Sequence, residues 1–480
     1  MRNIAIVWFR NDLRLLDNEA LVNACSTADY VIPVFVFDDR IYGGKTTKYN
    51  FLKTDKHRTK FSIESVHDLR NNLQSRSSNL IVRVGKPEDI IAQIANETKA
   101  SWVFCNREMT SEEIIVQDTL ERNLWKMGRE LVFSRGKMLY YTADLPFPVM
   151  HTPEIFTNFR KEVERFVQVR CPIEIPHDLK YNLNKINISI DPGEIPSIED
   201  FGFDNYEKTS TNFIGGESQS LKHVKTYIWE KKIIKSYKET RNELLGWDFS
   251  TKFSAWLAFG CVSPKFIYHE IKKFEKQHGS NESTYWVIFE LLWRDFFRLM
   301  GKKYGDKIFK EEGLASKKIQ YKNDPLHFKA WANGTTGIPF IDANMRELNQ
   351  TGFMSNRGRQ NVASFLCKDL KVSWLQGAEY FESLLLDYDP CSNYGNWNYI
   401  AGIGNDPRED RYFNVIGQGK KYDDKGEYIK HWLPELKNLP MEYIHTPWLM
   451  DTNEQVQYGV ILGKDYPQPI IDVSGLLKTA

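Results

Sequence analysis

The sequence predicts an α/β domain with a doubly wound parallel sheet, followed by a larger all-α domain. Over the first 134 residues, short apolar segments rich in Val, Ile and Phe alternate with helical patterns, as expected of parallel strands covered on both faces. A proline-rich stretch follows, and from about residue 217 the pattern is helical. The chain has 480 residues, a length typical of two or three domains.

The elements of the first part follow one another in strict alternation. The predicted strands are residues 4–9, 31–37, 80–84, 102–105 and 131–133, and the predicted helices are residues 18–25, 56–74, 87–96 and 111–126. Pro87 suits the first turn of a helix, where its missing N–H has no partner to lose, and acidic Glu88 and Asp89 suit the positive helix end. This alternation predicts the doubly wound sheet.

We expect three parts in the chain: an α/β domain over 1–134, a connector over 135–215 and a helical domain over 216–480. Seven prolines between Pro146 and Pro196 interrupt the connector, which we expect to hold one helix around residues 157–168. In the helical part, residues 283–304 predict a helix that is apolar around most of its girth and therefore buried.

Composition excludes several classes of protein. The formal net charge of +1 gives no global basic field, so a nucleic-acid site must be a local patch. Six scattered cysteines argue against a zinc site and for a reducing compartment. No apolar run is long enough to span a bilayer and the N-terminus starts directly with a strand pattern. We expect a soluble intracellular monomer, in the cytoplasm or in a eukaryotic nucleus or organelle.

The most informative segment is residues 385–399, LLDYDPCSNYGNWNY. Asp387 and Asp389 follow an apolar run, and burying such carboxylates costs several kcal/mol each unless cations or donors meet them. A surface loop has little use for Trp397. The segment therefore predicts a site for a polar, aromatic ligand at the edge of a core.

Three further segments carry candidate ligand groups. Ser250, Thr251, Lys252 and Ser254 precede a predicted helical stretch at 256–260, which suits a phosphate, although Ser and Thr are also ordinary helix caps. Arg359, in a stretch that leads into a predicted helix at 362–370, is a plausible partner for Asp387, the alternative being a solvated helix start.

The helix predicted over 283–304 carries three charges in its middle, Glu290, Arg294 and Asp295. Glu290 and Arg294 are four residues apart and share a face. Charges in a buried helix are either paired structural groups or contacts to a ligand, and the sequence leaves both readings open.

Together these segments resemble the photolyase/cryptochrome family over nearly the whole chain. The resemblance rests on WFRNDLR at 8–14, GCVSP at 260–264, ELLWRDF at 290–296, GIPFIDA at 337–343, NRGRQNVAS at 356–364 and the run from Asp387 to Trp397. Agreement over many separated motifs is far more specific than one short pattern. Within the family, the last two segments are most similar to the cryptochrome DASH branch.

The resemblance implies that the helical domain binds FAD. The implied contacts are Tyr237, Ser250, Thr251, Lys252 and Ser254 on the phosphate side; Trp293 and Arg294 in the pocket wall; Asn356 and Arg359 beside the flavin ring; and Asp387, Asp389 and Asn393 at polar edges of the cofactor. Asn393 would face flavin N5, where a neutral amide is a poor acid and favours a reduced anionic flavin.

The implied activity is light-driven repair of cyclobutane pyrimidine dimers by electron transfer from reduced FAD, a deoxyribodipyrimidine photo-lyase reaction. Glu290 and Trp293 would contact the dimer, with Gln360 and Tyr399 beside it. Tyr399 and Gln360 stand where enzymes that repair duplex DNA have Trp and Met. The resulting pocket is more polar, so we expect a preference for single-stranded or looped DNA.

Two accessory features follow from the resemblance. Trp397 and Trp374 match the first two members of an electron relay, and the third position falls on Tyr321, unless Trp331 serves instead. Glu108 matches a carboxylate that contacts an antenna cofactor, which we expect to be 5,10-methenyltetrahydrofolate, with an empty antenna site as the alternative.

Two other functions compete with repair. One is a blue-light photoreceptor that signals through partners with weak or no repair; the absence of a long tail beyond Trp448 and the identity of Asn393 both favour the enzyme. The other is a flavoprotein that merely binds nucleic acid or shuttles electrons. The sequence does not separate repair from photoreception.

Overall fold

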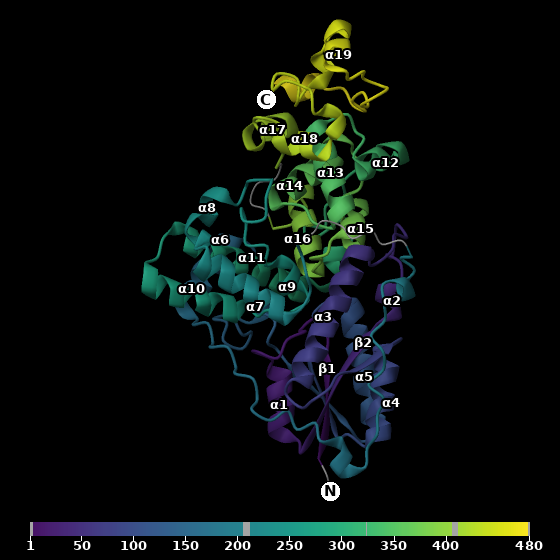
Figure 1. Cartoon of the computed structure of the whole chain (residues 1–480), viewed down its shortest axis with the longest axis vertical. Coiled ribbons are helices and arrows are strands. Elements are labelled where there is room, and N and C mark those ends of the chain that lie inside the picture. Colours follow the sequence, from purple (N-terminus) through teal and green to yellow (C-terminus); the bar gives the residue numbers. More distant parts are fainter. Residues whose placement is uncertain (1–2, 205–211, 323, 406–410, 479–480) are drawn as a thin grey trace.

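Five parallel strands form one sheet near the N-terminus in the computed structural model, which describes residues 3–204, 212–322, 324–405 and 411–478 (Figure 1). The strands are β1 (Ile4–Phe9), β2 (Tyr30–Phe37), β3 (Ile81–Val84), β4 (Trp102–Asn106) and β5 (Glu130–Ser134), in the order β3-β2-β1-β4-β5. Every residue of β1 is buried, as expected of a central strand covered on both faces. The predicted doubly wound sheet is confirmed.

The helices of this part match the prediction closely. They are α1 (Glu19–Thr27), α2 (Asp39–Tyr42), α3 (Lys56–Gln74), α4 (Pro87–Thr98) and α5 (Ser111–Lys126). Helices α3 and α5 have the predicted bounds, and α1 starts one residue late because the Asn18 side chain caps it by accepting from Leu21 N. Only the single turn α2 was not predicted.

The connector contains η1 (Val149–His151), α6 (Phe156–Phe166), η2 (Leu183–Ile186) and η3 (Glu199–Phe201). Its one α-helix lies where a helix was predicted. Between the short elements the chain follows the sheet, where Val31 N donates to Lys180 O and Val82 N to Pro192 O. The division of the chain at residues 134 and 216 stays a prediction.

The remaining chain is helical. Its elements are α7 (Glu217–Lys225), η4 (Thr226–Glu230), η5 (Ile233–Ser236), α8 (Tyr237–Thr240), α9 (Ser254–Ala258), α10 (Pro264–His278), α11 (Glu282–Tyr304), η6 (Gly305–Phe309), α12 (Pro325–Asn333), α13 (Pro339–Thr351), α14 (Asn356–Ser364), η7 (Phe365–Asp369), α15 (Trp374–Leu384), α16 (Pro390–Ala401), α17 (Val415–Tyr422), α18 (Glu427–Trp432), η8 (Pro434–Leu436), η9 (Pro447–Leu449), α19 (Thr452–Tyr458) and α20 (Ser474–Lys478). None of the described helices is both long and apolar enough to cross a bilayer.

Three predictions about these helices need correction. The helix predicted at 256–260 is the single turn α9. The helix predicted at 362–370 begins earlier, as α14, because the Ser355 side chain caps it by accepting from Gly358 N at 3.0 Å. Helix α11 is buried as predicted over most of its length, and the correction concerns one face, where Trp286, Phe289 and Trp293 are only partly buried.

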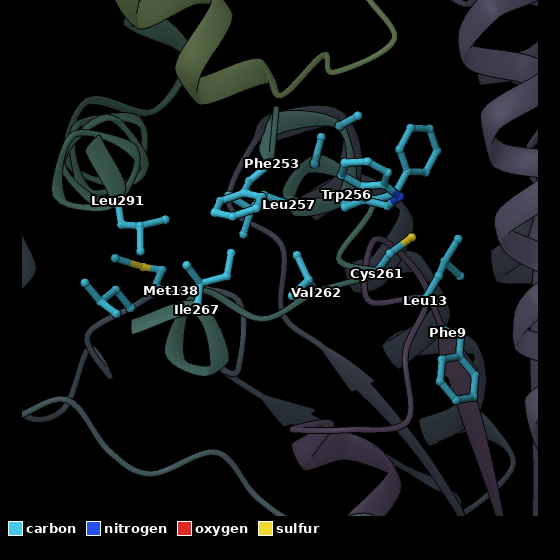
Figure 2. Close-up of a cluster of buried hydrophobic side chains, with 14 of the residues drawn as sticks. Phe9, Leu13, Met138, Phe253, Trp256, Leu257, Cys261, Val262, Ile267 and Leu291 are labelled. Carbon is cyan, nitrogen blue, oxygen red and sulfur yellow. The ribbon is translucent and has the colours of Figure 1, made fainter. Parts of the chain in front are cut away.

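The first motif of the chain, residues 8–14, joins the sheet to the helical part. Leu13 N donates to Phe259 O at 3.1 Å, and the buried Arg14 guanidinium donates to Gly260 O at 2.9 Å and Gly136 O at 3.0 Å. Phe9 and Leu13 lie in the same buried cluster as Trp256 and Cys261, as Figure 2 shows. The two parts of the chain therefore share one hydrophobic core.

Candidate functional site

A cavity of about 480 Å³ lies in the helical part of the molecule. That volume is within the range of sites that hold cofactors. The cavity is lined by sixteen of the residues that the sequence singled out: Tyr237, Ser250, Thr251, Lys252, Ser254, Glu290, Trp293, Arg294, Asn356, Arg359, Gln360, Asp387, Asp389, Asn393, Trp397 and Tyr399. Residues separated by up to 162 positions thus meet in one space, which sequence periodicity alone cannot show.

One side of the cavity is rich in hydroxyls around a buried cation. The side chains of Ser250, Thr251 and Ser254 border it, and none of these hydroxyls bonds to a residue that the structure describes. Lys252 is 5% exposed, and its ammonium lies 3.4 Å from the centre of the Phe249 ring and 4.5 Å from that of Phe353. Burial lowers the pKa of Lys252 to about 7.

Within the described chain, Lys252 has neither an ion pair nor a hydrogen bond to an anion. The ammonium contacts two ring faces, and the carboxylates of Glu347 and Asp387 act on it without an ion pair and do not offset the cost of its burial. An anion beside it would restore its charge. Together with the free hydroxyls, this donor set suits a phosphate group. Because α9 is a single turn, its helix dipole contributes little to the binding of a phosphate.

Carboxylates and amides also line the cavity, and the Arg359 guanidinium lies over the same Phe353 ring as Lys252. The predicted pairing of Arg359 with Asp387 is confirmed: Arg359 Nη2 donates to both oxygens, at 3.0 and 2.8 Å. Arg359 Nε donates instead to Met354 O at 2.9 Å. The contact with Asp387 therefore uses one nitrogen and not the two parallel bonds of a bidentate Arg–carboxylate pair.

Asp389 is committed to the protein itself. It forms an ion pair with Arg298, and its Oδ1 accepts from Ser392 N at 2.9 Å, capping α16. Burial alone would raise the pKa of Asp389, but Arg298 and Arg294 outweigh burial and hold it well below its usual range. Asp389 thus shapes the cavity wall as an ionised helix cap.

One hydrogen bond from its amide nitrogen fixes the Asn393 side chain. Its Nδ2 donates to Ala378 O at 3.0 Å and the side chain is buried. With one N–H engaged, the Oδ1 acceptor and the second N–H of the amide remain for a ligand in the cavity. Asn356, in contrast, lies at the exposed start of α14.

The three charges of α11 take three different roles. Glu290 pairs with Arg241 of the segment after α8, while Arg294 donates to Lys137 O at 2.8 Å and Leu257 O at 3.1 Å. Asp295 accepts from Leu139 N and Tyr140 N, at 3.0 and 2.9 Å, and fixes the connector. Asp295 is therefore structural, whereas Glu290 and Arg294 border the cavity.

Burial raises the pKa of the Glu290 carboxyl, and the Arg241 guanidinium only partly offsets this effect. Burial also lowers the pKa of Arg294 to about 10, with Arg298 adding repulsion. A carboxyl with a raised pKa, half-exposed at the edge of a cavity, is well placed to share a proton with a ligand.

The aromatic wall includes residues that sequence reasoning selected. The Trp293 and Tyr399 rings meet edge to face with centroids 6.0 Å apart. Tyr399 also accepts a hydrogen bond from Arg411 Nη2 at 3.1 Å, and Gln360 accepts from Arg357 Nη1 at 2.9 Å. Tyr399 and Gln360, the two positions on which the expected strand preference depends, thus both accept hydrogen bonds from arginines.

Sequence reasoning missed other residues of the wall. Phe249, Phe297, Phe353, Phe381 and Arg411 also line the cavity. Phe353 lies three residues before the start of the 356–364 motif, and that closeness in sequence was an available signal. Arg411 offered no local signal, because only the path of the chain brings it to Tyr399.

Trp397 borders the cavity and is nearly fully buried. A Cβ on Gly377 would lie 2.3 Å from Cη2 of its ring, so a glycine is required for this contact. Trp374 and Trp331 are buried in the same hydrophobic cluster, and Tyr321 packs against it. The Trp331 and Trp397 ring centroids are 6.4 Å apart.

Glu108 does not line this cavity but lies beside a smaller space that shares Ala258, Tyr388 and Asp389 with it, near the carboxyl end of β4. Its side chain and that of Lys137 are both 4% exposed and form an ion pair. Although burial raises the pKa of Glu108, Lys137 and Arg10 overcome that effect and keep it below its usual value. The space beside the pair is about 20 Å³, room for one water molecule.

That space is too small for a pteridine ring, so a folate at Glu108 stays an expectation of the resemblance. The residues of the large cavity do fit FAD. Its free hydroxyls and Lys252 suit a diphosphate, and its carboxylate, amide and aromatic groups suit a flavin and an adenosine.

Comparisons with known proteins agree with this assignment. Two family models match: DNA photolyase over residues 5–177 and FAD binding domain of DNA photolyase over residues 286–480. A cryptochrome DASH from Xenopus laevis is 49% identical over 473 residues, covering 98% of this chain and 90% of the relative. A relative from Arabidopsis thaliana, named cryptochrome DASH, chloroplastic/mitochondrial, is 46% identical and covers 95% and 81%.

Solved structures give the same result. The crystal structure of a Synechocystis sp. cryptochrome has a TM-score of 0.94 and 46% identity, covering 99% of this chain and 98% of that one. A bacterial class III photolyase from Agrobacterium tumefaciens has a TM-score of 0.86 and 28% identity, covering 100% and 96%.

Proposed function

The chain belongs to the cryptochrome DASH branch of the photolyase/cryptochrome family, and we propose that it is a blue-light-driven enzyme that repairs cyclobutane pyrimidine dimers in single-stranded or looped DNA. Its cofactor is FAD. The observation that carries the proposal is that one cavity of about 480 Å³ is lined both by the FAD-binding groups and by Glu290, Trp293 and Tyr399.

FAD, when bound in its reduced form, supplies a light-driven electron that splits the dimer and then returns, so that there is no net redox change. The protein contributes position and electrostatics. Ser250, Thr251, Lys252 and Ser254, with Tyr237 beside them, would hold the phosphate side. Arg359, oriented by its hydrogen bonds to Asp387, and Asn356 would border the flavin ring.

Asn393 would keep protons away from the flavin. With Nδ2 donating to Ala378 O, the side chain presents an acceptor and has no acidic proton to give. The same position with a carboxylic acid could donate a proton. This arrangement favours the anionic reduced cofactor that repair requires.

Glu290 would bind the dimer. Its raised pKa favours a protonated carboxyl, which can donate a hydrogen bond to a pyrimidine carbonyl oxygen. Trp293 would supply a flat surface for one base, and stacking of a base on an aromatic ring contributes about 1–3 kcal/mol. Both side chains border the same end of the cavity as Tyr399.

The preference for single strands is supported by the polar contacts of Tyr399 and Gln360. Each is bound by an arginine, Arg411 and Arg357 respectively, which weakens their value as apolar stacking surfaces. Extruding a dimer from a duplex costs a few kcal/mol, whereas a single strand costs less. A pocket that recovers little of this cost by stacking should act poorly on duplex DNA.

Trp397, Trp374 and Tyr321 would form the route by which electrons reach the flavin for its reduction. Trp397 and Trp374 are buried in one cluster, with Tyr321 against its outer side. Trp331, at 6.4 Å from Trp397, is a second candidate for a branch. Tyrosine loses a proton on oxidation, which should slow the last step at Tyr321.

An antenna folate at Glu108 belongs to the proposal only through the resemblance. Such a site requires the Lys137–Glu108 pair to open, because the space beside it is about 20 Å³. The test is a titration of the purified protein with 5,10-methenyltetrahydrofolate. Stoichiometric binding with energy transfer to FAD would support the antenna, and no binding would remove it.

The experiment that tests the proposed activity is repair of a thymine dimer in a single-stranded oligonucleotide, with the flavin chemically reduced beforehand. We expect repair under blue light and none in the dark or with oxidised flavin. A protein that binds FAD, reduces it under light and repairs nothing would contradict the proposal and favour a photoreceptor.

A further inference from the structure

The substrate wall of the cavity stands on a second aromatic layer that comes from the connector. Along one face of α11, Phe289 and Trp293 are partly buried and line the cavity. Behind them lies α6, the connector helix, which packs beside α11 (Figure 1). Its first residue, Phe156, is 6% exposed and does not line the cavity itself.

Phe156 is stacked on Trp293. The ring centroids are 3.7 Å apart and the planes are inclined by 8°. Phe289 and Phe296 meet the edge of the Phe156 ring, at 5.1 and 5.7 Å and both at 81°. A parallel stack this close covers one face of the Trp293 indole, while the two edge contacts hold Phe156 in place.

Polar contacts hold α6 against α11 one turn further along. Arg160 Nη1 donates to Tyr285 Oη at 2.6 Å, and Tyr285 Oη donates to Glu164 Oε1 at 2.6 Å. The Arg160 guanidinium also lies 5.7 Å from the centre of the Phe289 ring. The position of Phe156 is therefore set by the whole helix and not by its own stacking alone.

We propose that Phe156 is a positioning residue for substrate binding: it fixes the plane of Trp293 so that one defined face of the indole receives a pyrimidine of the dimer. The inference rests on the proposed function. It assigns to the connector a direct influence on substrate recognition, through a residue that contacts neither substrate nor FAD.

The geometry explains why a flat partner is needed. Trp293 also meets Phe296 and Tyr399 edge to face, at 88° and 86°, so these rings limit sliding but provide no parallel surface. Phe297, inclined by 31°, gives only a tilted contact. Removal of the Phe156 ring would let the indole tilt, and stacking on a base depends on the orientation of both planes.

The test compares Phe156→Leu with Phe159→Leu in the full FAD-loaded protein. Phe159 lies on the same helix and is fully buried; among the described residues its ring contacts are with Phe147, Phe156 and Phe296, not with Trp293. It is therefore the matched control for lost packing. Phe156→Tyr retains the flat ring and serves as the rescue variant.

For Phe156→Leu we expect KM for a dimer in a single-stranded oligonucleotide to rise about 3- to 10-fold, the value of one aromatic stack. The light-driven rate at saturating substrate and the FAD absorbance should not change. Phe159→Leu should lower the melting temperature and leave KM within twofold, and Phe156→Tyr should restore KM. An unchanged KM in Phe156→Leu, or an equal rise in both leucine variants, would overturn the inference.

Binding in the dark separates this inference from the proposed function. Fluorescence anisotropy measures the affinity for a labelled single strand with and without a thymine dimer, and needs no repair. Absence of repair in the unmodified protein would contradict the proposed function. A loss of dimer-specific affinity confined to Phe156→Leu would still support positioning, and equal affinity in all variants would overturn it.

Discussion

The FAD cavity and the cluster at Glu108 both bury charged groups, yet they differ in where the counter-charges come from. At Glu108 the carboxylate has Lys137 at its side, both side chains are 4% exposed, and about 20 Å³ remains open. In the cavity Lys252 is just as buried but is held by two aromatic rings, beside about 480 Å³ of open space.

This difference shows which of two motif-bearing regions is built for a ligand. A doubly wound sheet usually binds its ligand at the carboxyl ends of the strands where the strand order reverses, here between β1 and β4. In this chain the junction of residues 8–14 with Phe259 and Gly260 closes that place. The ligand site lies in the helical part instead.

The largest expected effect comes from removing one charge of the closed cluster. Lys137→Met leaves Glu108 buried without its cation, so the free energy of unfolding should fall by about 3–5 kcal/mol. The FAD content per folded protein should stay unchanged. Chemical denaturation and the flavin absorbance measure the two quantities.

The double variant Lys137→Met with Glu108→Gln is the control, because it removes both charges and should regain most of the lost stability. Loss of FAD with little loss of stability in Lys137→Met would reverse the comparison. It would show that the Glu108 cluster supports the cofactor and not only the fold.

Glu290 combines features of both regions. Like Glu108 it has an ion-pair partner, Arg241, but unlike Glu108 it borders the large cavity. Glu290→Ala should retain FAD and reduce dimer repair by about 10- to 100-fold, the value of one strong hydrogen bond to substrate. Repair rates with pre-reduced flavin measure this effect. Unchanged repair would remove Glu290 from the substrate site.

The protonation of Glu290 predicts a pH dependence. Burial raises the pKa of its carboxyl, so the protonated donor persists above the usual carboxyl range and is lost as pH rises through the shifted pKa. Repair should therefore decline with rising pH. Glu290→Gln, which always keeps a neutral donor, should remove that decline, and a decline of equal size in Glu290→Gln would assign it to another group.

Replacing Lys252 should have a smaller effect, which concerns the affinity for FAD and not the stability of the fold. Replacing it by Met should raise the dissociation constant of FAD about 10-fold or more, since a charge-assisted hydrogen bond to phosphate is lost. Stability of the FAD-free protein should change little, because the variant removes the desolvation cost of a buried cation but also its attraction to the buried Glu347 and to Asp387. Equilibrium titration of the FAD-free protein with FAD measures the dissociation constant, and chemical denaturation measures the stability.

The same residue predicts how FAD affinity changes with pH. With the pKa of Lys252 lowered to about 7 in the FAD-free protein, the ammonium is charged below pH 7 and FAD binding requires proton uptake above it. The dissociation constant should then rise up to tenfold per pH unit above pH 7. Lys252→Arg stays charged and should show no such rise; parallel curves would exclude Lys252 as the phosphate partner.

The sequence predicted more of the sheet than of the site. Strand β1 has the predicted bounds, β2, β3 and β4 differ by one residue at one end, and β5 by one residue at each end, because buried parallel strands are continuous apolar runs. The start of α14 was missed since the cap at Ser355 is a local hydrogen bond hidden among polar residues. The partly exposed face of α11 was missed because an aromatic wall and a core look alike in sequence.

Short motifs in the sequence identified most residues of the cavity, but not the contacts that these residues make with one another and with the backbone. The Arg359–Asp387 pair could be inferred because each side chain needed the other. The structural role of Asp295 depends on backbone N–H groups of a distant segment, Leu139 and Tyr140. Asp389 caps α16 locally through Ser392 N, whereas its ion-pair partner Arg298 comes from α11. The stack of Phe156 on Trp293 joins the connector to the helical part, and no periodicity encodes such a contact.

The measurement that tests the central claim most directly is blue-light repair of one thymine dimer in matched single-stranded and duplex oligonucleotides, with pre-reduced flavin. We predict efficient repair of the single strand and much weaker repair of the duplex. The double variant Tyr399→Trp with Gln360→Met should increase duplex repair by restoring apolar stacking. Equal repair of both substrates by the unmodified protein would contradict the account of this pocket, and repair of neither would contradict the enzyme.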